Sequence, residues 1–184
     1  AFTGLSPDKA YVFRVAAGDG ANPTSSYVTS SPTYTLANPA AAPTLSNAAT
    51  SSIQVTINTN GNPTNTFYAI YNATSGNFLT ASGTATSSPV YFTTSTWNDG
   101  RAYGLTPSTS HQFSVVARNG GGINAATSSL SSALSTLAVI TPNTPSITAS
   151  NPTTSTLQLA INTNGNSVTT TYAILNVTTG MYLT

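Results

Sequence analysis

The sequence predicts an all-β protein made of two-sheet β-sandwiches that recur about every 100 residues. Three observations favour this fold. Apolar residues alternate with polar residues along short stretches, blocks of sequence recur at a nearly fixed separation, and clusters of Gly and Asn stand between the stretches. A period of two is typical of strands buried on one side, and Gly and Asn tolerate the backbone angles of tight turns. No window has the 3.6-residue period of a helix.

The composition excludes several classes of function. Charged residues are only 4% of the 184 residues and the net charge is +1, while 25 Ser and 35 Thr supply most of the polar surface. With 39% hydrophobic residues the chain can build a core, so disorder is not expected. Four Lys and Arg residues are too few for nucleic-acid binding, and no apolar run is long enough for membrane insertion in this segment.

Internal similarity is the strongest pattern in the chain. Residues 57–62 recur as residues 161–166, an offset of 104, and residues 4–7 recur with one change as residues 104–107, an offset of 100. A unit of this size is one sandwich domain. We therefore expect three parts: residues 1–38 as the C-terminal part of one repeat, residues 40–139 as a complete repeat, and residues 140–184 as the N-terminal part of a further repeat.

The joins between these parts contain Pro, in residues 37–43 and 140–145. Pro restricts its own backbone and biases the preceding residue towards extended conformations, so we expect semi-rigid spacers. Two explanations are open for the incomplete outer parts. The plainer one is that the sequence is a window in a longer repetitive chain. The other is that separate chains complete each other, the last strands of one copy closing the sandwich begun by another.

Within the complete repeat, alternating residues predict the strands and the core. One parity of each strand is apolar, and turns are expected at residues 60–63, 75–77, 98–100 and 119–122. The predicted architecture is a seven-strand, two-sheet sandwich. Its core is expected to contain Ile53, Val55, Ile57, Tyr68, Ile70, Leu105, Phe113 and Val115.

Residues 105–121 resemble the strand F motif of the fibronectin type III family, an immunoglobulin-like β-sandwich, and residues 5–17 carry a second copy. The resemblance implies that Tyr11 is a structural corner residue, hydrogen-bonded to backbone. His111 takes the corner position in the middle repeat, and Ile57 replaces the family's strand B tryptophan. The Thr- and Asn-rich sequence is similar to bacterial cell-surface and secreted members of the family.

The sequence offers little for catalysis. It has no Glu and no Cys, its acids are Asp8, Asp19 and Asp99, and its only His is His111. A catalytic dyad, a triad or a zinc site needs more groups than these. Residues 18–22 have some likeness to a calcium loop but lack spaced acidic ligands, so a plain turn is favoured. We expect no enzyme activity, no cofactor and no metal.

Features that could bind a partner are weaker. The family resemblance implies a partner loop at Arg118, Asn119, Gly120, Gly121 and Gly122, although a simple hairpin loop is the plainer interpretation. Trp97 and Tyr91 could form a platform for sugars or cover the end of the core. Asn72 and Asn176 begin sequons for N-glycosylation at corresponding places.

These observations favour a non-enzymatic structural or adhesive segment of an extracellular protein, either secreted or on a cell surface. Such a segment belongs in a filament, stalk or surface layer. Its expected partners are copies of itself, assembled head to tail or laterally, or neighbouring repeats of the same chain, with glycans as a further candidate. The alternative is a spacer module in a secreted polysaccharide-degrading enzyme.

Overall fold

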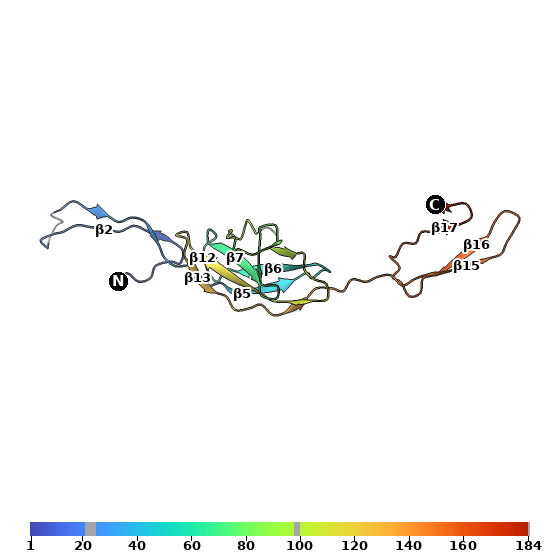
Figure 1. Ribbon diagram of the computed structural model, residues 1–184. Helices are drawn as coiled ribbons and strands as arrows, with labels where there is room; N and C mark the ends of the chain where they lie inside the picture. Colours follow the sequence, from blue (N-terminus) through green and yellow to red (C-terminus); the bar gives the residue numbers. More distant parts are fainter. Residues whose placement is uncertain (21–24, 98–99, 184) are drawn as a thin grey trace. The chain divides into compact units, whose positions relative to one another are not determined.

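The structure is a computed structural model that describes residues 1–20, 25–97 and 100–183 (Figure 1). Within these residues all regular structure is β, and no helix is long and apolar enough to cross a membrane. The chain divides into two compact units, Ala1–Val139 and Ile140–Thr184. The first unit joins an N-terminal segment, residues 1–38, to a middle sandwich, residues 40–139. The second unit, here called the C-terminal segment, begins at Ile140, the first residue of the third predicted part.

The middle sandwich has two antiparallel sheets. One has the order β10 (Arg101–Tyr103), β6 (Ser52–Asn58) and β5 (Ala41–Ser46). The other has the order β13 (Asn124–Thr127), β12 (Phe113–Arg118), β7 (Phe67–Asn72), β8 (Asn77–Leu79) and β9 (Ala85–Thr86). A short pair, β11 (Ser110–His111) with β14 (Leu134–Ser135), completes it. This confirms an all-β, immunoglobulin-like sandwich. The short strands β9, β11 and β14 add to the seven predicted strands.

The core lies between these sheets. Seven of the eight predicted core residues are buried; the exception is Ile57, which is partly exposed near the end of β6 and packs against the edge of the core. Strand β12 pairs with β7 so that Val115 lies opposite Ile70. Trp97, which the prediction did not assign to the core, is buried there too.

In the part of each outer segment that the structure describes, the strands form two-stranded sheets. The N-terminal segment pairs β1 (Ala10–Tyr11) with β4 (Thr33–Tyr34), and β2 (Arg14–Val15) with β3 (Val28–Thr29). The C-terminal segment pairs β15 (Ser146–Ser150) with β16 (Gln158–Asn162), and β17 (Leu175–Asn176) with β18 (Met181–Tyr182). Many of their large apolar side chains are exposed.

Replacement of Phe113 by Ala tests the core. Its ring is fully buried, so the substitution leaves a cavity and should lower the free energy of unfolding by about 3–5 kcal/mol, measured by urea denaturation. Phe67→Ala is the matched control, because Phe67 is exposed on β7, and it should cost less than about 1 kcal/mol. Equal losses in the two variants would contradict the placement of Phe113 in the core.

Candidate functional site

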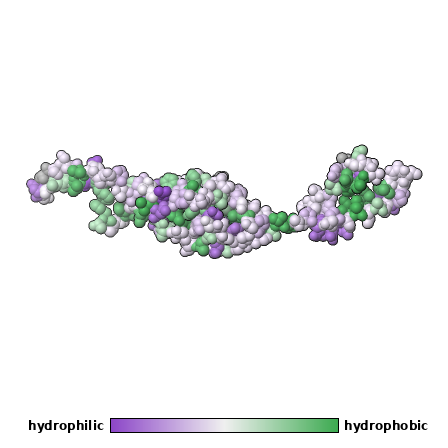
Figure 2. All heavy atoms as spheres, in the orientation of Figure 1, coloured by the Kyte–Doolittle hydropathy of each residue, from purple (hydrophilic) through white to green (hydrophobic). Residues whose placement is uncertain are grey.

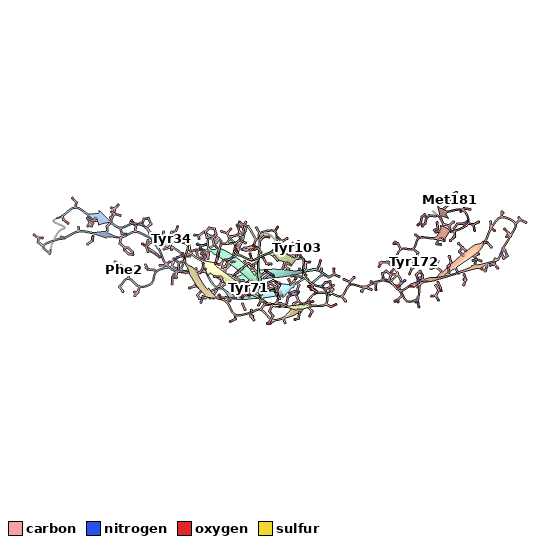
Figure 3. The ribbon with its side chains drawn as sticks, viewed as in Figure 1. Phe2, Tyr34, Tyr71, Tyr103, Tyr172 and Met181 are labelled. Atoms are coloured by element: carbon pink, nitrogen blue, oxygen red, sulfur yellow. The ribbon has the colours of Figure 1, made fainter. Side chains whose placement is uncertain are left out.

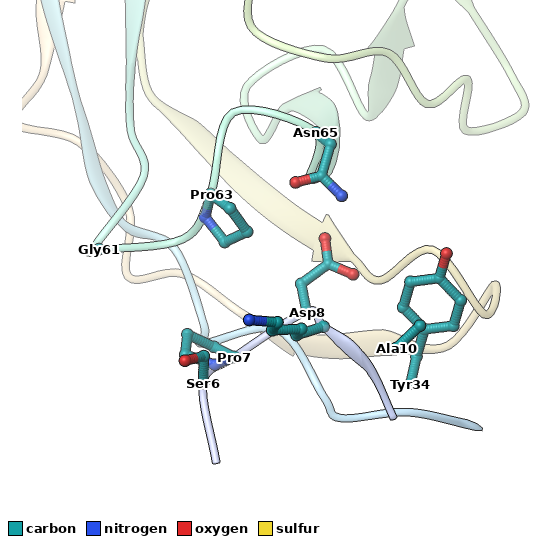
Figure 4. Close-up of a pocket in the computed structure, with 9 residues that line it drawn as sticks. Ser6, Pro7, Asp8, Ala10, Tyr34, Gly61, Pro63 and Asn65 are labelled. Carbon is teal, nitrogen blue, oxygen red and sulfur yellow. The ribbon is translucent and has the colours of Figure 1, made fainter. Parts of the chain in front are cut away.

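The most elaborate polar site in the first unit is the junction between the N-terminal segment and the middle sandwich, and Asp8 lies at its centre. The carboxylate of Asp8 accepts a hydrogen bond from the hydroxyl of Thr66 at 2.7 Å and another from the backbone N–H of Gly120 at 2.7 Å. Asp8 is only 2% exposed. Figure 4 shows its carboxylate pointing from the N-terminal segment towards the loop that carries Pro63 and Asn65. Hydrogen bonds to an ionised acceptor are stronger than neutral ones, so this contact holds the segment against two loops of the sandwich.

Tyr34 and Asn119 extend the junction. Asn119 donates from Nδ2 to the carbonyl oxygen of Thr35 at 2.9 Å, and its Oδ1 accepts from the N–H of Ile123 at 2.7 Å. The ring of Tyr34 lies directly against Gly120, so a side chain at position 120 would overlap it. Tyr34 stands where the segment meets the sandwich (Figure 3). The absence of a side chain at Gly120 thus lets its N–H reach Asp8.

Asn side chains fasten the connecting chain itself. The N–H of Asn38 donates to Oδ1 of Asn62 at 2.7 Å, and Nδ2 of Asn62 donates to the carbonyl of Asn38 at 2.8 Å. The same reciprocal pair recurs inside the C-terminal segment between Asn143 and Asn166, at 2.6 and 2.8 Å. Reciprocal bonds of this kind fix the extended chain beside the loop that follows β6 or β16.

A buried phenol lies close to the junction. The hydroxyl of Tyr68 is buried near Asn62 and Thr66 but completes no hydrogen bond with either. Burial raises the pKa of Tyr68; nearby Asn62 and Thr66 oppose that rise and the charge of Asp8 adds to it. The surface beside Asp8 is hollowed into a groove of about 560 Å³ lined by Ser6, Lys9, Tyr34, Gly61 and other residues (Figure 4).

The predicted partner loop is part of this junction. Gly120 binds Asp8, and Asn119 binds Thr35, so two of its five residues contact the N-terminal segment. Arg118 folds back along the loop instead. Its Nε donates to the carbonyl of Gly122 at 2.9 Å, and its guanidinium lies 4.8 Å from the centre of the Tyr91 ring. A methyl group added at Gly121 would reach ordinary contact distance from Tyr34.

The two corner residues occupy corresponding places. The hydroxyl of Tyr11 accepts a hydrogen bond from the N–H of Ser6 at 2.9 Å. His111 is buried, and its Nδ1 lies 3.3 Å from Nδ2 of Asn72, which donates to it and leaves the proton of the neutral ring on Nε2. Burial lowers the pKa of His111, while the nearby backbone of Thr106 opposes that shift without forming a well-aligned hydrogen bond to Nε2.

The sequons and the aromatic pair serve the local structure. Asn72 is 1% exposed, and its Oδ1 accepts from the N–H groups of Thr74 and Ser75. A glycan on Nδ2 of Asn72 would disrupt its buried contact with His111, whereas Asn176 is exposed in the C-terminal segment. Trp97 is buried and donates from Nε1 to the carbonyl of Tyr68 at 3.0 Å, so it offers no face to a sugar.

Neither a metal cluster nor a catalytic constellation is assembled among the described residues. No three His, Cys, Asp or Glu side chains come together in the ranges described, and the buried His111 has an amide, not a carboxylate, beside it. Asp99 and residues 21–22 of the candidate calcium loop lie outside the described residues. The sequence pattern assigned Asp8 no structural role, because its hydrogen-bond partners lie 58 and 112 residues away along the chain.

Gly120→Ala tests the junction. The added methyl group would displace the Tyr34 ring and pull the Gly120 N–H from Asp8, so the amide of residue 120 should exchange with solvent at least tenfold faster in hydrogen-exchange NMR. Gly121→Ala is the matched control, because its methyl group would lie 3.4 Å from Cβ of Tyr34 and should leave the exchange of residue 120 unchanged. Similar exchange in both variants would contradict the close packing of Tyr34.

His111→Tyr tests the corner. Because the folded pKa of His111 is lowered, the unfolded state binds the proton more readily. The stability from neutral His111 is then complete above the unfolded pKa of about 6.5 and is lost as pH falls from there through the folded pKa. The free energy of unfolding of wild type, measured by urea denaturation, should fall from pH 7.5 to pH 5.5. That of His111→Tyr should change less over the same range. Parallel profiles would show that His111 does not carry the pH dependence.

Comparisons with known proteins add no family assignment. No protein-family model matches the chain, and no curated protein matches it. Solved structures with similar folds include the fibronectin type-III domain of human fibronectin type III domain containing protein 3, with a TM-score of 0.37 and 19% identity over 55% of this chain and 86% of that chain. A crystal structure of domains from titin has a TM-score of 0.35 and 18% identity over 60% of this chain and 37% of that chain. The sandwich assignment therefore rests on the sheet topology described above.

Proposed function

We propose that this chain is a non-catalytic structural segment of an extracellular tandem-repeat protein, in which sandwich modules are held at fixed spacing along a filament, stalk or surface layer. The observation that carries the proposal is the buried carboxylate of Asp8. It ties the N-terminal segment to two separate loops of the middle sandwich, through Thr66 and Gly120. A joint with two charge-assisted bonds resists bending in a way that a plain peptide linker does not.

The surface supports the same function. With seven formally charged side chains among 184 residues, neighbouring modules repel each other little and can pack closely. Ser and Thr hydroxyls keep such a surface hydrated without charge. An extracellular location fits this chemistry and the resemblance to secreted and cell-surface repeat proteins. Glycans have less support as partners, because Trp97 is buried and presents no sugar platform.

Asp8→Ser tests the joint in the full chain. Serine is the residue at the corresponding position 108, so the change keeps the local turn and removes the carboxylate. In wild type, residual dipolar couplings of residues 5–11 and 33–38 should fit one alignment tensor with those of residues 40–139. In Asp8→Ser the two sets should need different tensors, because each lost bond to a charged group is worth about 1.5–3 kcal/mol.

Asp19→Ser is the control, since it removes the same charge from the N-terminal segment at an exposed position that makes none of the junction contacts described above. It should leave the common tensor intact. The proposal of a stiff joint would be rejected if wild-type couplings already needed separate tensors, or if Asp8→Ser retained a single tensor.

A further inference from the structure

The N-terminal segment exposes an apolar strand that the middle sandwich buries. Positions 13 and 15 correspond to positions 113 and 115 at the offset of 100. Phe13 is 37% exposed and Val15 is 68% exposed, whereas Phe113 and Val115 are fully buried. Phe113 and Val115 are covered in part because β12 pairs with β7 as well as with β13. Among the described residues β2 pairs with β3, and no strand lies on its other side.

The C-terminal segment contains a groove of about 900 Å³. Its lining combines Ser, Thr and Asn residues with the apolar side chains of Ile147, Leu157, Leu159, Ile174, Leu175 and Leu183. Figure 2 shows hydrophobic residues gathered on this segment. At the offset of 104, Leu157, Leu159 and Ile174 correspond to Ile53, Val55 and Ile70 of the middle sandwich, which are buried against Phe113 and its neighbours in one core. The groove lies where the counterpart of β12 would fill the core.

We propose that the groove of the C-terminal segment binds β2 of a second copy of this chain, so that the two segments close one sandwich between copies. The proposal rests on the proposed function and deepens it by naming the partner. The strand that fills the groove is identified from the register of β7 and β12. In that register Phe113 lies opposite Asn72, Ser114 opposite Tyr71 and Val115 opposite Ile70. Transferred by the two offsets, that register places Phe13 opposite Asn176, Arg14 opposite Leu175 and Val15 opposite Ile174.

The joined sandwich differs from the middle one in a defined way. The two segments contain no counterpart of residues 81–100, and residues 1–3, which correspond to β10 at the offset of 100, form no strand, so the sheet that contains β15 and β16 has two strands where the middle sandwich has three. The pairing of the β7–β12 type, which lies in the larger of the two sheets, is kept. Each copy then offers β2 at one site and a groove at another, and contacts of this head-to-tail type propagate into chains of copies instead of closing a dimer.

A complementation experiment with the full chain tests this directionality. Phe13→Asp with Val15→Asp blocks β2 and leaves the groove intact, and Leu159→Asp blocks the groove and leaves β2 intact. In sedimentation velocity, wild type should form a series of assemblies, and each blocked variant alone should remain at 18.7 kDa. An equal mixture of the two should give a species of twice that mass and nothing larger, because only one compatible pair of ends remains.

Disulfide trapping tests the register. The chain has no Cys, so Arg14→Cys with Leu175→Cys introduces the only thiols. Directly opposed antiparallel residues have Cα atoms about 4.5–5.5 Å apart, within the range that a disulfide bridges. Oxidation should give a ladder of linked copies on a denaturing gel. Arg14→Cys with Thr171→Cys, displaced by four residues or about 13 Å along the strand, should give at least tenfold less linked product.

Several results would overturn the proposal. A wild-type chain that stays monomeric, a mixture of blocked variants that does not pair, or equal cross-linking of both cysteine pairs would reject the contact. A cross-linked product that runs as a single closed chain would show that the groove takes the β2 of its own copy. Trp97 fluorescence should show unchanged unfolding of the middle sandwich in every variant. The Asp8→Ser measurement reads only the first unit, so either proposal can fail while the other stands.

Discussion

The pairing of β7 with β12 is the contact on which the rest of the sandwich depends. It brings together strands whose centres lie about 46 residues apart and opposes Val115 to Ile70, so that each covers the other and both face the opposite sheet. A sheet with one apolar face is stable in water only when something covers that face. The outer segments show the consequence. They form the local hairpins that their sequences encode, yet corresponding side chains such as Val15 are exposed, because no described strand pairs with β2 as β7 pairs with β12.

The same constraint explains why the joint before the middle sandwich is polar. A short, Pro-containing connection leaves little apolar surface to bury between modules, so directional hydrogen bonds have to set the geometry. Asp8 does this with an anion in a chain that has very few. At the corresponding position stands Ser108, and the strand register places Ser135 where Tyr34 would be. The boundary between the two compact units lies shortly after Ser135, at Val139–Ile140.

Much of the fold could be predicted from the sequence because it depends on short-range periodicity. Alternation identified Ile53, Val55 and Phe113 as core residues, and the family resemblance placed His111 at a buried corner. Ile57 was assigned by the same alternation, but its place near the end of β6 leaves it partly exposed. The junction could not be predicted, because no local pattern connects Asp8 with Gly120. Its function appears only when two distant turns meet, and Asp after Pro is common in turns of every kind.

The selection of partners and of register in this chain must therefore depend on shape and on the direction of hydrogen bonds. Salt bridges and charge patterns, which select partners in many assemblies, are scarce when only seven side chains are charged. Asn takes their place: Asn62 and Asn166 each close a reciprocal pair of bonds, and Asn119 links the loop to the preceding segment. An amide both donates and accepts, so it discriminates between registers that differ by a single residue, and it does so without adding charge. These amide pairs hold the connecting chain beside a loop of its own segment, through Asn38 and Asn62 in the first unit and through Asn143 and Asn166 in the second.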